Sequence, residues 1–493
     1  MRNIEMVLFI VNMILLFVCA FLPLPKKALL QTIGAGISMI CAGIQILVEG
    51  YRWQNIALYG SALIIGLMAF QSYRVRKSGQ PIQKSSISKT RTWLKQVFIV
   101  LALAVYIGAA AILPTILPVF AFSEPTGSFP VGTTTLFMED VTRGEPATDD
   151  PDDHRKLMVQ IWYPAEVSSE VPDADYIENV PVMLSGIREA MSLPPFLLSQ
   201  LRYVKTHAYT DAKISSAQER FPLLLFSPGL TGFRNQNTFQ VEELASQGYI
   251  VVGIDHPYDA AAVIYPDQTT ALLKLEGLSG FEDYKTKMSY WVDDTQFVLD
   301  QIEAMSSSAK SGILSGKVDM NQVGVFGHSF GGAAAAQMLM KDSRIQAALN
   351  MDGVLYGGSV PERGFNKPYL QMNAAQSIDY EWFTQSLDQA VEASGYDRKH
   401  YERFWAESQA RRKRAAVGKD AYFVVFDHAN HMSFTDFYLF SPLLPPGGAE
   451  PRRVQTCINE LSIAFFDKYL KGKQEIHMEE FIKDRNNITL QKP

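Results

Sequence analysis

Gly327-His328-Ser329-Phe330-Gly331-Gly332 is the stretch that decides the fold, because it places a serine between an expected strand and an expected helix. The preceding residues Val323-Gly324-Val325-Phe326 are apolar and short enough for a buried strand, and the alanine-rich residues that follow predict a helix. Glycines on both sides of the serine let strand and helix approach each other closely. Gly-x-Ser-x-Gly in this setting predicts a strained turn that presents a nucleophilic serine.

The residues after position 123 alternate between strand-like and helix-like segments, which is typical of a mostly parallel sheet flanked by helices. This order of elements predicts an α/β-hydrolase fold over residues 123–475, followed by a C-terminal tail at 476–493. We expect strands at 133–138, 157–163, 223–226, 250–254, 323–326, 345–351, 369–372 and 422–426, and helices near 238–247, 285–305, 330–341 and 453–469.

Apolar stretches dominate the first 122 residues. Each is close to the roughly 20 residues that a helix needs to cross a bilayer core. A cleaved signal peptide would account for the first stretch but not for the others. We therefore expect an N-terminal transmembrane region of about four helices, with spans near 6–24, 28–48, 53–73 and 97–117.

Basic residues indicate how these spans are oriented. Residues 71–95 contain Lys and Arg side chains but no acidic residue, and Lys26 and Lys27 lie between the first two spans. Cytoplasmic loops of membrane proteins carry an excess of Lys and Arg. With both loops inside, everything after the fourth span lies outside. We therefore expect a multi-pass protein of the cell membrane with an extracytoplasmic catalytic domain.

Composition excludes several classes of function. The formal net charge of −6 over 493 residues gives no nucleic-acid-binding signature. Of the three cysteines, Cys19 and Cys41 lie in expected spans and only Cys457 lies beyond them, so no disulfide framework is expected there. No metal-ligand set with suitable spacing and no glycine-rich nucleotide loop is present, so we expect neither a metal nor a cofactor. The oligomeric state stays open.

Candidate catalytic residues follow the expected strands, because chemistry in such sheets gathers at the carboxyl ends of strands. Ser329 ends one strand, Asp352 follows the next, and His431 comes just after the last. The chain order Ser, Asp, His is the one that this fold uses. Asp427 is an alternative acid and His428 an alternative base, and position alone does not choose between the two histidines.

Several segments between about residues 125 and 470 resemble the platelet-activating-factor acetylhydrolase family of α/β-hydrolases. The resemblance rests on the serine motif, the acid 23 residues after the serine, and three further stretches: Ile161-Trp162-Tyr163-Pro164, Phe226-Ser227-Pro228-Gly229-Leu230-Thr231-Gly232-Phe233-Arg234 and His431-Met432-Ser433-Phe434-Thr435-Asp436-Phe437. It favours His431 over His428 as the base.

The same resemblance implies an oxyanion hole. Leu230 would donate one backbone N–H, and Phe330, the residue after the nucleophile, would donate the other. Pro228 stands where many family members have histidine. The other histidines, including His328 and His256, are expected to be structural or exposed to solvent.

Together these features predict a serine esterase that forms an acyl-enzyme. The resemblance implies short-chain acyl esters as substrates, including sn-2 acetyl or short acyl groups of phospholipids, with a lipid bilayer as partner. A broader carboxylesterase or polyester hydrolase is the alternative enzyme. A non-catalytic sensor or binding domain on a membrane scaffold is the alternative of another class.

Two features of the stretch between Asp352 and His431 are open to interpretation. Aromatic residues at 380–383 and 401–405 would either cap an acyl pocket or fill a small core of their own. The basic run Arg411-Arg412-Lys413-Arg414 is expected to be a solvated helix end rather than a phosphate site. If this stretch faces the bilayer, its basic and aromatic residues would favour anionic lipid surfaces.

Overall fold

The computed structural model describes residues 1–21, 27–77, 89–167, 171–191, 194, 196–274, 280–308, 312–394, 396–444, 450–485 and 487–491. The chain forms two compact units. The first comprises Met1–Phe120 with the short segments Leu198–Tyr203 and Phe440–Leu443. The second comprises Ala121–Leu197, Val204–Leu439 and Leu444–Pro493.

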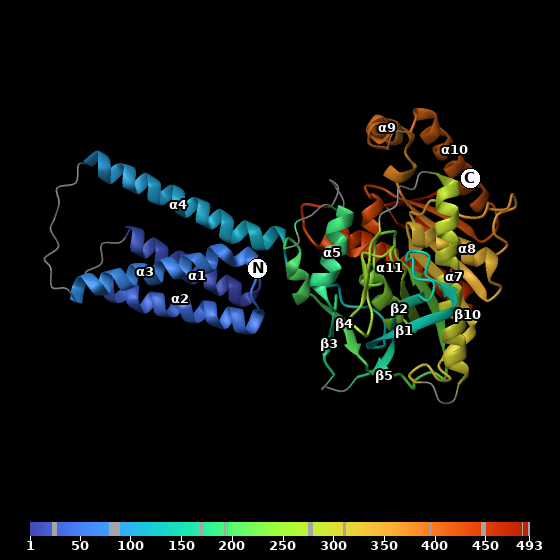
Figure 1. Cartoon of the computed structure of the whole chain (residues 1–493), viewed down its shortest axis with the longest axis horizontal. Helices are drawn as coiled ribbons and strands as arrows, with labels where there is room; N and C mark the ends of the chain where they lie inside the picture. Colours follow the sequence, from blue (N-terminus) through green and yellow to red (C-terminus); the bar gives the residue numbers. More distant parts are fainter. Residues whose placement is uncertain are drawn as a thin grey trace. The chain divides into compact units, whose positions relative to one another are not determined.

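The first unit is built from the helices α1 (Asn3–Phe21), α2 (Lys27–Glu49), α3 (Ile56–Lys77) and α4 (Lys89–Ile116) (Figure 1). Three stretches are long and apolar enough to cross a membrane, namely Leu29–Glu49, Trp53–Arg74 and Gln96–Ile116. The apolar part of α1 that is described, Asn3–Val18, is shorter. The structure therefore supports three of the expected spans by length and composition, and the first span stays a prediction.

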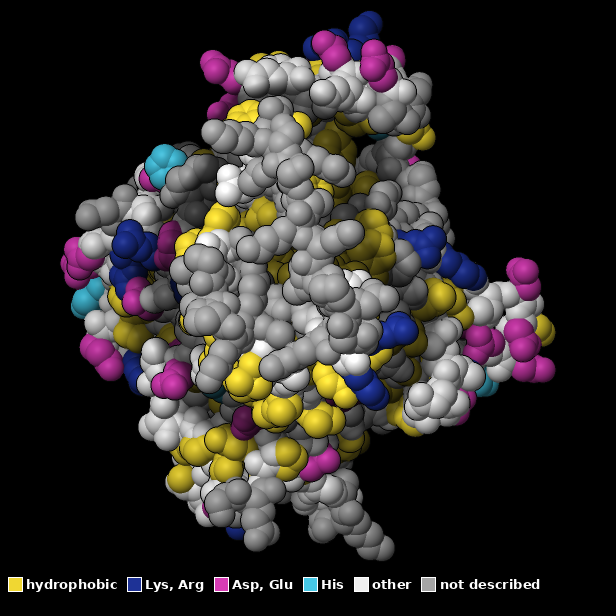
Figure 2. Space-filling model, turned by 90° about the vertical axis from the view of Figure 1, so that its left-hand side faces the viewer, with side chains coloured by type: hydrophobic (Ala, Val, Ile, Leu, Met, Phe, Trp, Pro, Cys, Tyr) yellow, Lys and Arg dark blue, Asp and Glu magenta, His cyan; other side chains and the backbone are white. Residues whose placement is uncertain are grey.

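Large apolar side chains are exposed on each of these helices, and some are visible in yellow in Figure 2. Leu47, Val48, Ile40 and Phe98 are examples, with 64–87 % of their surface exposed. Such a surface is unfavourable in water and suits a hydrocarbon environment. Lys26 and residues 78–88 of the expected basic loop lie outside the described residues.

Polar groups inside the first unit join its helices. The Asn12 amide donates to Ser61 Oγ at 2.8 Å and accepts from the Ser38 hydroxyl, while the Ser61 hydroxyl donates to Tyr106 at 3.2 Å. A buried ion pair joins Glu5 to the Arg52 guanidinium at 2.9 Å, near the start of α1. The apolar sequence pattern gives no sign of these contacts.

The second unit is centred on a mixed sheet with the strand order β14-β13-β12-β11-β10-β6-β7-β2-β1-β4-β3. Along this order, the neighbouring strands β13, β12, β11, β10, β6 and β7 are parallel to one another. The strands β2, β3 and β14 run antiparallel to their neighbours. The bounds are β1 (Val131–Gly144), β2 (His154–Glu166), β3 (Asp173–Asp175), β4 (Lys205–Thr210), β5 (Lys213–Ile214), β6 (Phe221–Ser227), β7 (Ile250–Asp255), β10 (Val318–His328), β11 (Ile345–Met351), β12 (Tyr369–Ala374), β13 (Ala421–Phe426) and β14 (Ile488–Gln491); β5 pairs with β2, and β8 (Ala262–Ile264) pairs with β9 (Thr270–Leu272).

Helices cover both faces of this sheet. The side chains of Leu223 and Leu225 in β6 join a core with residues of α7 and α8. The intervening residue Leu224 and the ring of Phe326 lie on the other face, where Phe326 contacts Phe466 of α11, as the two-residue period of a strand requires. The helices are α5 (Val180–Met191), α6 (Thr238–Ser246), α7 (Phe281–Ser307), α8 (Phe330–Lys341), α9 (Tyr380–Ser394), α10 (Arg398–Ala415), α11 (Pro451–Tyr469) and α12 (Met478–Lys483).

Every expected strand and helix of the catalytic region is present, with ends that differ by several residues in places. The structure adds short strands at the sheet edge, β3 and β4, together with β5. Residues 476–493, expected as a tail, contain α12 and β14, and β14 pairs antiparallel with β13. Short edge strands have few residues to reveal a pattern, and their pairing depends on contacts that are distant in sequence.

Candidate active site

Ser329 sits at a strained turn between β10 and α8. Its backbone has φ 54° and ψ −119°, a conformation that non-glycine residues rarely adopt. A Cβ atom at Gly327 would clash with the Gly331 backbone, and one at Gly331 would clash with the carbonyl oxygens of Ser227 and Pro228. Both glycines are therefore required by the close approach of β10, α8 and the end of β6.

We expect Gly331→Ala to lower the free energy of unfolding by roughly 1–3 kcal/mol, because the new methyl group meets backbone atoms that cannot move independently. The matched control is Gly144→Ala in β1, where the nearest atom to a Cβ lies 3.8 Å away. Thermal unfolding of the detergent-solubilised full chain measures both. Equal melting temperatures for the two variants would show that the turn is not tightly packed.

The structure brings Ser329, His431 and Asp352 together. His431 Nε2 lies 2.9 Å from Ser329 Oγ, and His431 Nδ1 lies 2.7 Å from Asp352 Oδ2. The His431 side chain is 44 % exposed, so solvent reaches the base, whereas the Asp352 side chain is fully buried. Asp427 and His428, the alternative acid and base, are exposed and take no part in this hydrogen-bonded chain.

Asp352 is held as a carboxylate by its surroundings. Besides His431, it accepts hydrogen bonds from the Ala374 N–H at 2.9 Å and from the Ser377 hydroxyl at 2.6 Å. Burial alone would favour the neutral acid, but the hydrogen bonds from His431 and Ser377 and the nearby Arg412 guanidinium hold the pKa of Asp352 below its ordinary value. A carboxylate in this position can orient the imidazole and stabilise its protonated form.

Leu230 and Phe330, the expected oxyanion donors, lie in two segments that meet beside the serine. A Cβ at Gly229 would lie 3.3 Å from the Cβ of Ser329, so the loop after β6 touches the turn. Among the described residues, neither the Leu230 nor the Phe330 N–H donates a hydrogen bond within the protein. Both donors are therefore free to bind an oxygen atom of a substrate.

The loop that carries Leu230 is anchored on its far side. The Thr231 N–H donates to the Asp259 carbonyl at 2.9 Å. The Arg234 N–H donates to Asp255 Oδ1 at 2.6 Å, and its guanidinium forms an ion pair with the same carboxylate. These contacts anchor the loop at Thr231 and Arg234.

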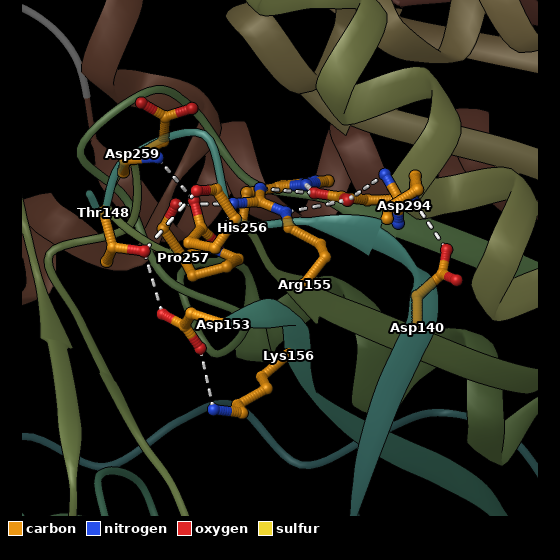
Figure 3. Close-up of polar contacts among 12 residues, drawn as sticks. Asp140, Thr148, Asp153, Arg155, Lys156, His256, Pro257, Asp259 and Asp294 are labelled. Atoms are coloured by element: carbon orange, nitrogen blue, oxygen red, sulfur yellow. Dashed lines mark hydrogen bonds and ion pairs between the residues drawn. The ribbon is translucent and has the colours of Figure 1, made fainter. Parts of the chain in front are cut away.

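A second serine–histidine–aspartate chain lies beneath this loop. His256 Nε2 is 3.3 Å from Ser227 Oγ, and His256 Nδ1 is 2.9 Å from Asp294 Oδ2. Arg155 forms an ion pair with Asp294 at 2.7 Å, and these side chains point toward one another in Figure 3. Ser227 is 6 % exposed, whereas His256 and Asp294 are fully buried. All three side chains are buried, so His256 is not exposed to solvent, and its structural role stays a prediction.

The aromatic rings of α9 and α10 contact one another and α7. Phe383 stacks on Trp405 with ring centroids 4.5 Å apart, and Phe404 stacks on Phe281 of α7 at 5.0 Å. These rings are half-buried, and the choice between a cap over an acyl pocket and a small core stays open. Tyr380 and Trp382 remain exposed.

The prediction of a solvated helix end at residues 411–414 was wrong for two of the four residues. Arg411 and Arg412 are each only 6 % exposed. The Arg411 guanidinium lies over the Phe281 ring at 4.4 Å and donates to the Leu355 carbonyl at 2.9 Å. Arg412 donates to the Ser377 carbonyl at 3.2 Å. Burial lowers the pKa of the Arg412 guanidinium, and the nearby Asp352 carboxylate offsets part of this effect.

Sequence reasoning missed Ser377 and Arg412 as neighbours of Asp352. Both belong to the region between β12 and β13: Ser377 follows the carboxyl end of β12 by three residues, and Arg412 lies in α10. The same rule that indicates Asp352 and His431 could therefore have indicated Ser377. Arg412 carries no such signal, because only the folded insertion brings it to the carboxylate.

His328, next to the nucleophile, is almost fully buried at 2 % exposure. Burial, helped by the nearby His431, lowers the pKa of His328 from 6.5 to about 3. The imidazole is therefore neutral in the folded protein throughout the physiological pH range.

This burial predicts a pH dependence of stability. Below about pH 6.5 the unfolded chain binds a proton at His328 that the folded chain excludes until about pH 3. The contribution of His328 to the free energy of unfolding should therefore fall by about 1.4 kcal/mol per pH unit on acidification within this window, and should not depend on pH above it. Denaturation of wild type and His328→Gln between pH 7.5 and 4.5 measures the difference, and equal slopes would contradict the prediction.

The fold and the comparisons with known proteins define the class of this chain as a carboxylic ester hydrolase. A solved structure, the ferulic acid esterase from Streptomyces cinnamoneus, superposes with a TM-score of 0.57 at 26 % identity, covering 76 % of this chain and 100 % of the esterase. The family model described as "Platelet-activating factor acetylhydrolase, isoform II" matches residues 118–305 and 291–487, which is more than half of the chain. The chain belongs to this family.

Curated relatives agree with the family. The platelet-activating factor acetylhydrolase of Cavia porcellus is 26 % identical over 348 residues, covering 64 % of this chain and 73 % of the relative. The probable 1-alkyl-2-acetylglycerophosphocholine esterase of Arthroderma benhamiae is 29 % identical over 292 residues, covering 54 % of this chain and 68 % of the relative.

Proposed function

We propose that this chain is a membrane-tethered serine esterase that cleaves short-chain acyl esters, with the sn-2 acetyl or short acyl groups of phospholipids as the leading substrates. The observation that carries this proposal is the hydrogen-bonded chain from Ser329 through His431 to Asp352, with distances of 2.9 and 2.7 Å. The three residues come from three distant segments. Their convergence beside two free backbone N–H groups supports acyl transfer.

In the proposed mechanism, Ser329 Oγ attacks the ester carbonyl while His431 Nε2 takes the hydroxyl proton. The carbonyl oxygen becomes an oxyanion, which the N–H groups of Leu230 and Phe330 stabilise by about 3 kcal/mol each. Asp352 stabilises the imidazolium through Nδ1. Collapse of the intermediate breaks the ester bond, and His431 returns the proton to the departing alcohol. Water, activated by the same imidazole, then hydrolyses the acyl-enzyme.

The names of the relatives support the substrate class. One relative is described as an esterase of 1-alkyl-2-acetylglycerophosphocholine, which carries an acetyl ester and a phosphocholine head. For this chain we expect kcat/KM to fall as the acyl chain lengthens, and to be higher for esters that bear phosphocholine than for those that do not. Hydrolysis rates over acyl lengths of two to eight carbons, with and without the head group, test this.

A broader carboxylesterase is the second candidate, and the ferulic acid esterase neighbour favours it. Such an enzyme would hydrolyse aryl and alkyl esters without regard to phosphocholine. Equal rates with and without the head group in the same experiment would select this candidate and reject the phospholipid substrate.

The apolar helices of the first unit support the membrane tether. We propose four spans that place the catalytic region outside the cytoplasmic membrane. Intact cells that express the full chain should then hydrolyse an ester that does not cross membranes. Hydrolysis only after the membrane is permeabilised would reverse the proposed orientation.

A further inference from the structure

His328 links the three segments that carry the proposed catalytic groups. Its Nδ1 lies 2.9 Å from Gln236 Nε2, and its Nε2 lies 2.9 Å from the carbonyl oxygen of His431. The other end of the Gln236 side chain, Oε1, accepts the Gly229 N–H at 3.3 Å. We call this chain of hydrogen bonds, from Gly229 through Gln236 and His328 to His431, the Gln236–His328 bridge.

The chemistry of each end determines where the protons lie. The Gly229 N–H can only donate, so the Gln236 oxygen faces it and the Gln236 NH2 group faces His328. That NH2 group can also only donate, so His328 Nδ1 accepts and is unprotonated. The His431 carbonyl can only accept, so His328 Nε2 carries the proton and donates it. A neutral His328 of one tautomer therefore satisfies every contact of the bridge.

The bridge reaches a neighbour of each proposed catalytic group. Gly229 precedes Leu230, the oxyanion donor; His328 precedes Ser329; and the bridge ends on the backbone of His431 itself. Its members come from the loop after β6, the end of β10 and the loop after β13. A displacement of one segment can therefore be transmitted to the other two through these hydrogen bonds alone.

Further contacts from the neighbourhood of Gln236 reinforce the same connection. The Asp436 N–H donates to the Gln236 carbonyl at 2.9 Å, and the Asn237 side chain donates to the Phe434 carbonyl at 2.7 Å. Asp436 Oδ2 in turn accepts the N–H of Thr238, at the start of α6, at 2.7 Å. The loop of the proposed base and the helix after the oxyanion loop are thus joined on both sides of the bridge.

We propose that Gln236 and His328 are positioning residues for ester hydrolysis. The His328 ring packs against the His431 ring with centroids 4.6 Å apart, but the hydrogen bonds of both residues go to neighbouring groups and not to Ser329 Oγ or His431 Nε2. The bridge sets the distance between the Leu230 N–H, Ser329 Oγ and His431 Nε2. This inference rests on the proposed serine mechanism. Because displacement of a reacting group by about 1 Å can slow an enzyme on the order of 100-fold, loss of the bridge should act on kcat more than on KM.

The test compares variants of the detergent-solubilised full chain on a soluble acetyl ester, p-nitrophenyl acetate. Gln236→Met and His328→Leu each break the bridge, and we expect kcat to fall about 10- to 100-fold with KM within about 2-fold of wild type. His328→Gln keeps a donor for the His431 carbonyl and an acceptor for Gln236, and should recover most of the lost rate. A purely structural role of the side chain would not produce this recovery together with an unchanged KM.

Gln337→Met is the matched control. This glutamine of α8 also donates two hydrogen bonds, to the carbonyls of Tyr356 and Gly358. Among the described residues, its hydrogen bonds do not reach the loop after β6, the end of β10 or the loop after β13. It should leave kcat within about 2-fold of wild type. If His328→Leu fails to fold, Gln236→Met compared with Gln337→Met carries the test alone.

The double variant Gln236→Met/His328→Leu shows whether the two residues act as one unit. A shared bridge predicts that the double variant is no more than about 3-fold slower than the slower single variant, because the connection is already lost. Multiplied losses, unchanged kcat in both single variants, or failure of His328→Gln to recover activity would overturn the inference. An inactive wild type would instead reject the proposed function, so the two failures are distinguishable.

Discussion

Ser329→Ala is expected to lower kcat for ester hydrolysis on the order of 10⁶-fold, because it removes the atom that forms the acyl-enzyme. The residual rate would come from the Leu230 and Phe330 N–H groups acting on a water attack. The substitution removes one oxygen from a half-buried side chain, so the melting temperature should change little. Steady-state hydrolysis of a short-chain ester, measured with the folded variant, tests this prediction.

The control for this prediction is Ser227→Ala. Ser227 also lies next to a histidine that bonds an aspartate, but its side chain is buried. It should retain turnover of the same order as wild type. If Ser329→Ala hydrolysed the ester as fast as wild type, the assignment of the nucleophile would be wrong, whatever the result for Ser227.

Asp352→Asn is expected to lower kcat about 10⁴-fold while leaving the fold intact. The amide oxygen can still accept the Ala374 N–H at the Oδ1 position, and the NH2 group at the Oδ2 position can donate to the Ser377 hydroxyl oxygen, so the side chain should keep its place. However, it carries no charge to stabilise the imidazolium, and its NH2 group favours the wrong tautomer of His431. Single-turnover acylation of the purified variant measures the effect at the chemical step.

Asp427→Asn, at the exposed alternative acid, is the matched substitution and should leave acylation unchanged. If Asp352→Asn slowed acylation less than about 10-fold, Asp352 would have a structural role in the turn after β11, and the acid would have to be sought elsewhere.

The centre of the fold could be predicted from the sequence because its signals are local. The β10–turn–α8 unit follows from two required glycines and a serine, and the parallel strands follow from continuous apolar runs. The edge strand β14 could not be predicted, since Ile488–Gln491 is short and becomes a strand only through its pairing with β13. The prediction of a solvated helix end at residues 411–414 was wrong because burial there also depends on tertiary contacts. Arg411 and Arg412 are buried only after α10 folds against Leu355 and Ser377.

The residues of the candidate site likewise form two groups: those that a sequence pattern indicates and those that only tertiary contacts bring together. Ser329, Asp352 and His431 each follow a strand, so a general rule for parallel sheets indicates the three positions. The rule does not separate His431 from His428, and only the family resemblance favours His431. Most of the contacts that hold them do not follow strands in this manner. Ser377 reaches Asp352 from the turn after β12, but Arg412 reaches it from α10, and Gln236 meets His328 across two loops. Such partners depend on tertiary packing, which a single sequence does not display.

The most direct test of the central claim is labelling of the full chain with a fluorophosphonate, followed by mass mapping of the modified peptide. A serine made nucleophilic by its neighbours should carry the only adduct, so we predict modification at Ser329 and slow or absent labelling in His431→Ala. An adduct on Ser227 or another serine, or no adduct on the folded wild type, would contradict the proposed serine mechanism.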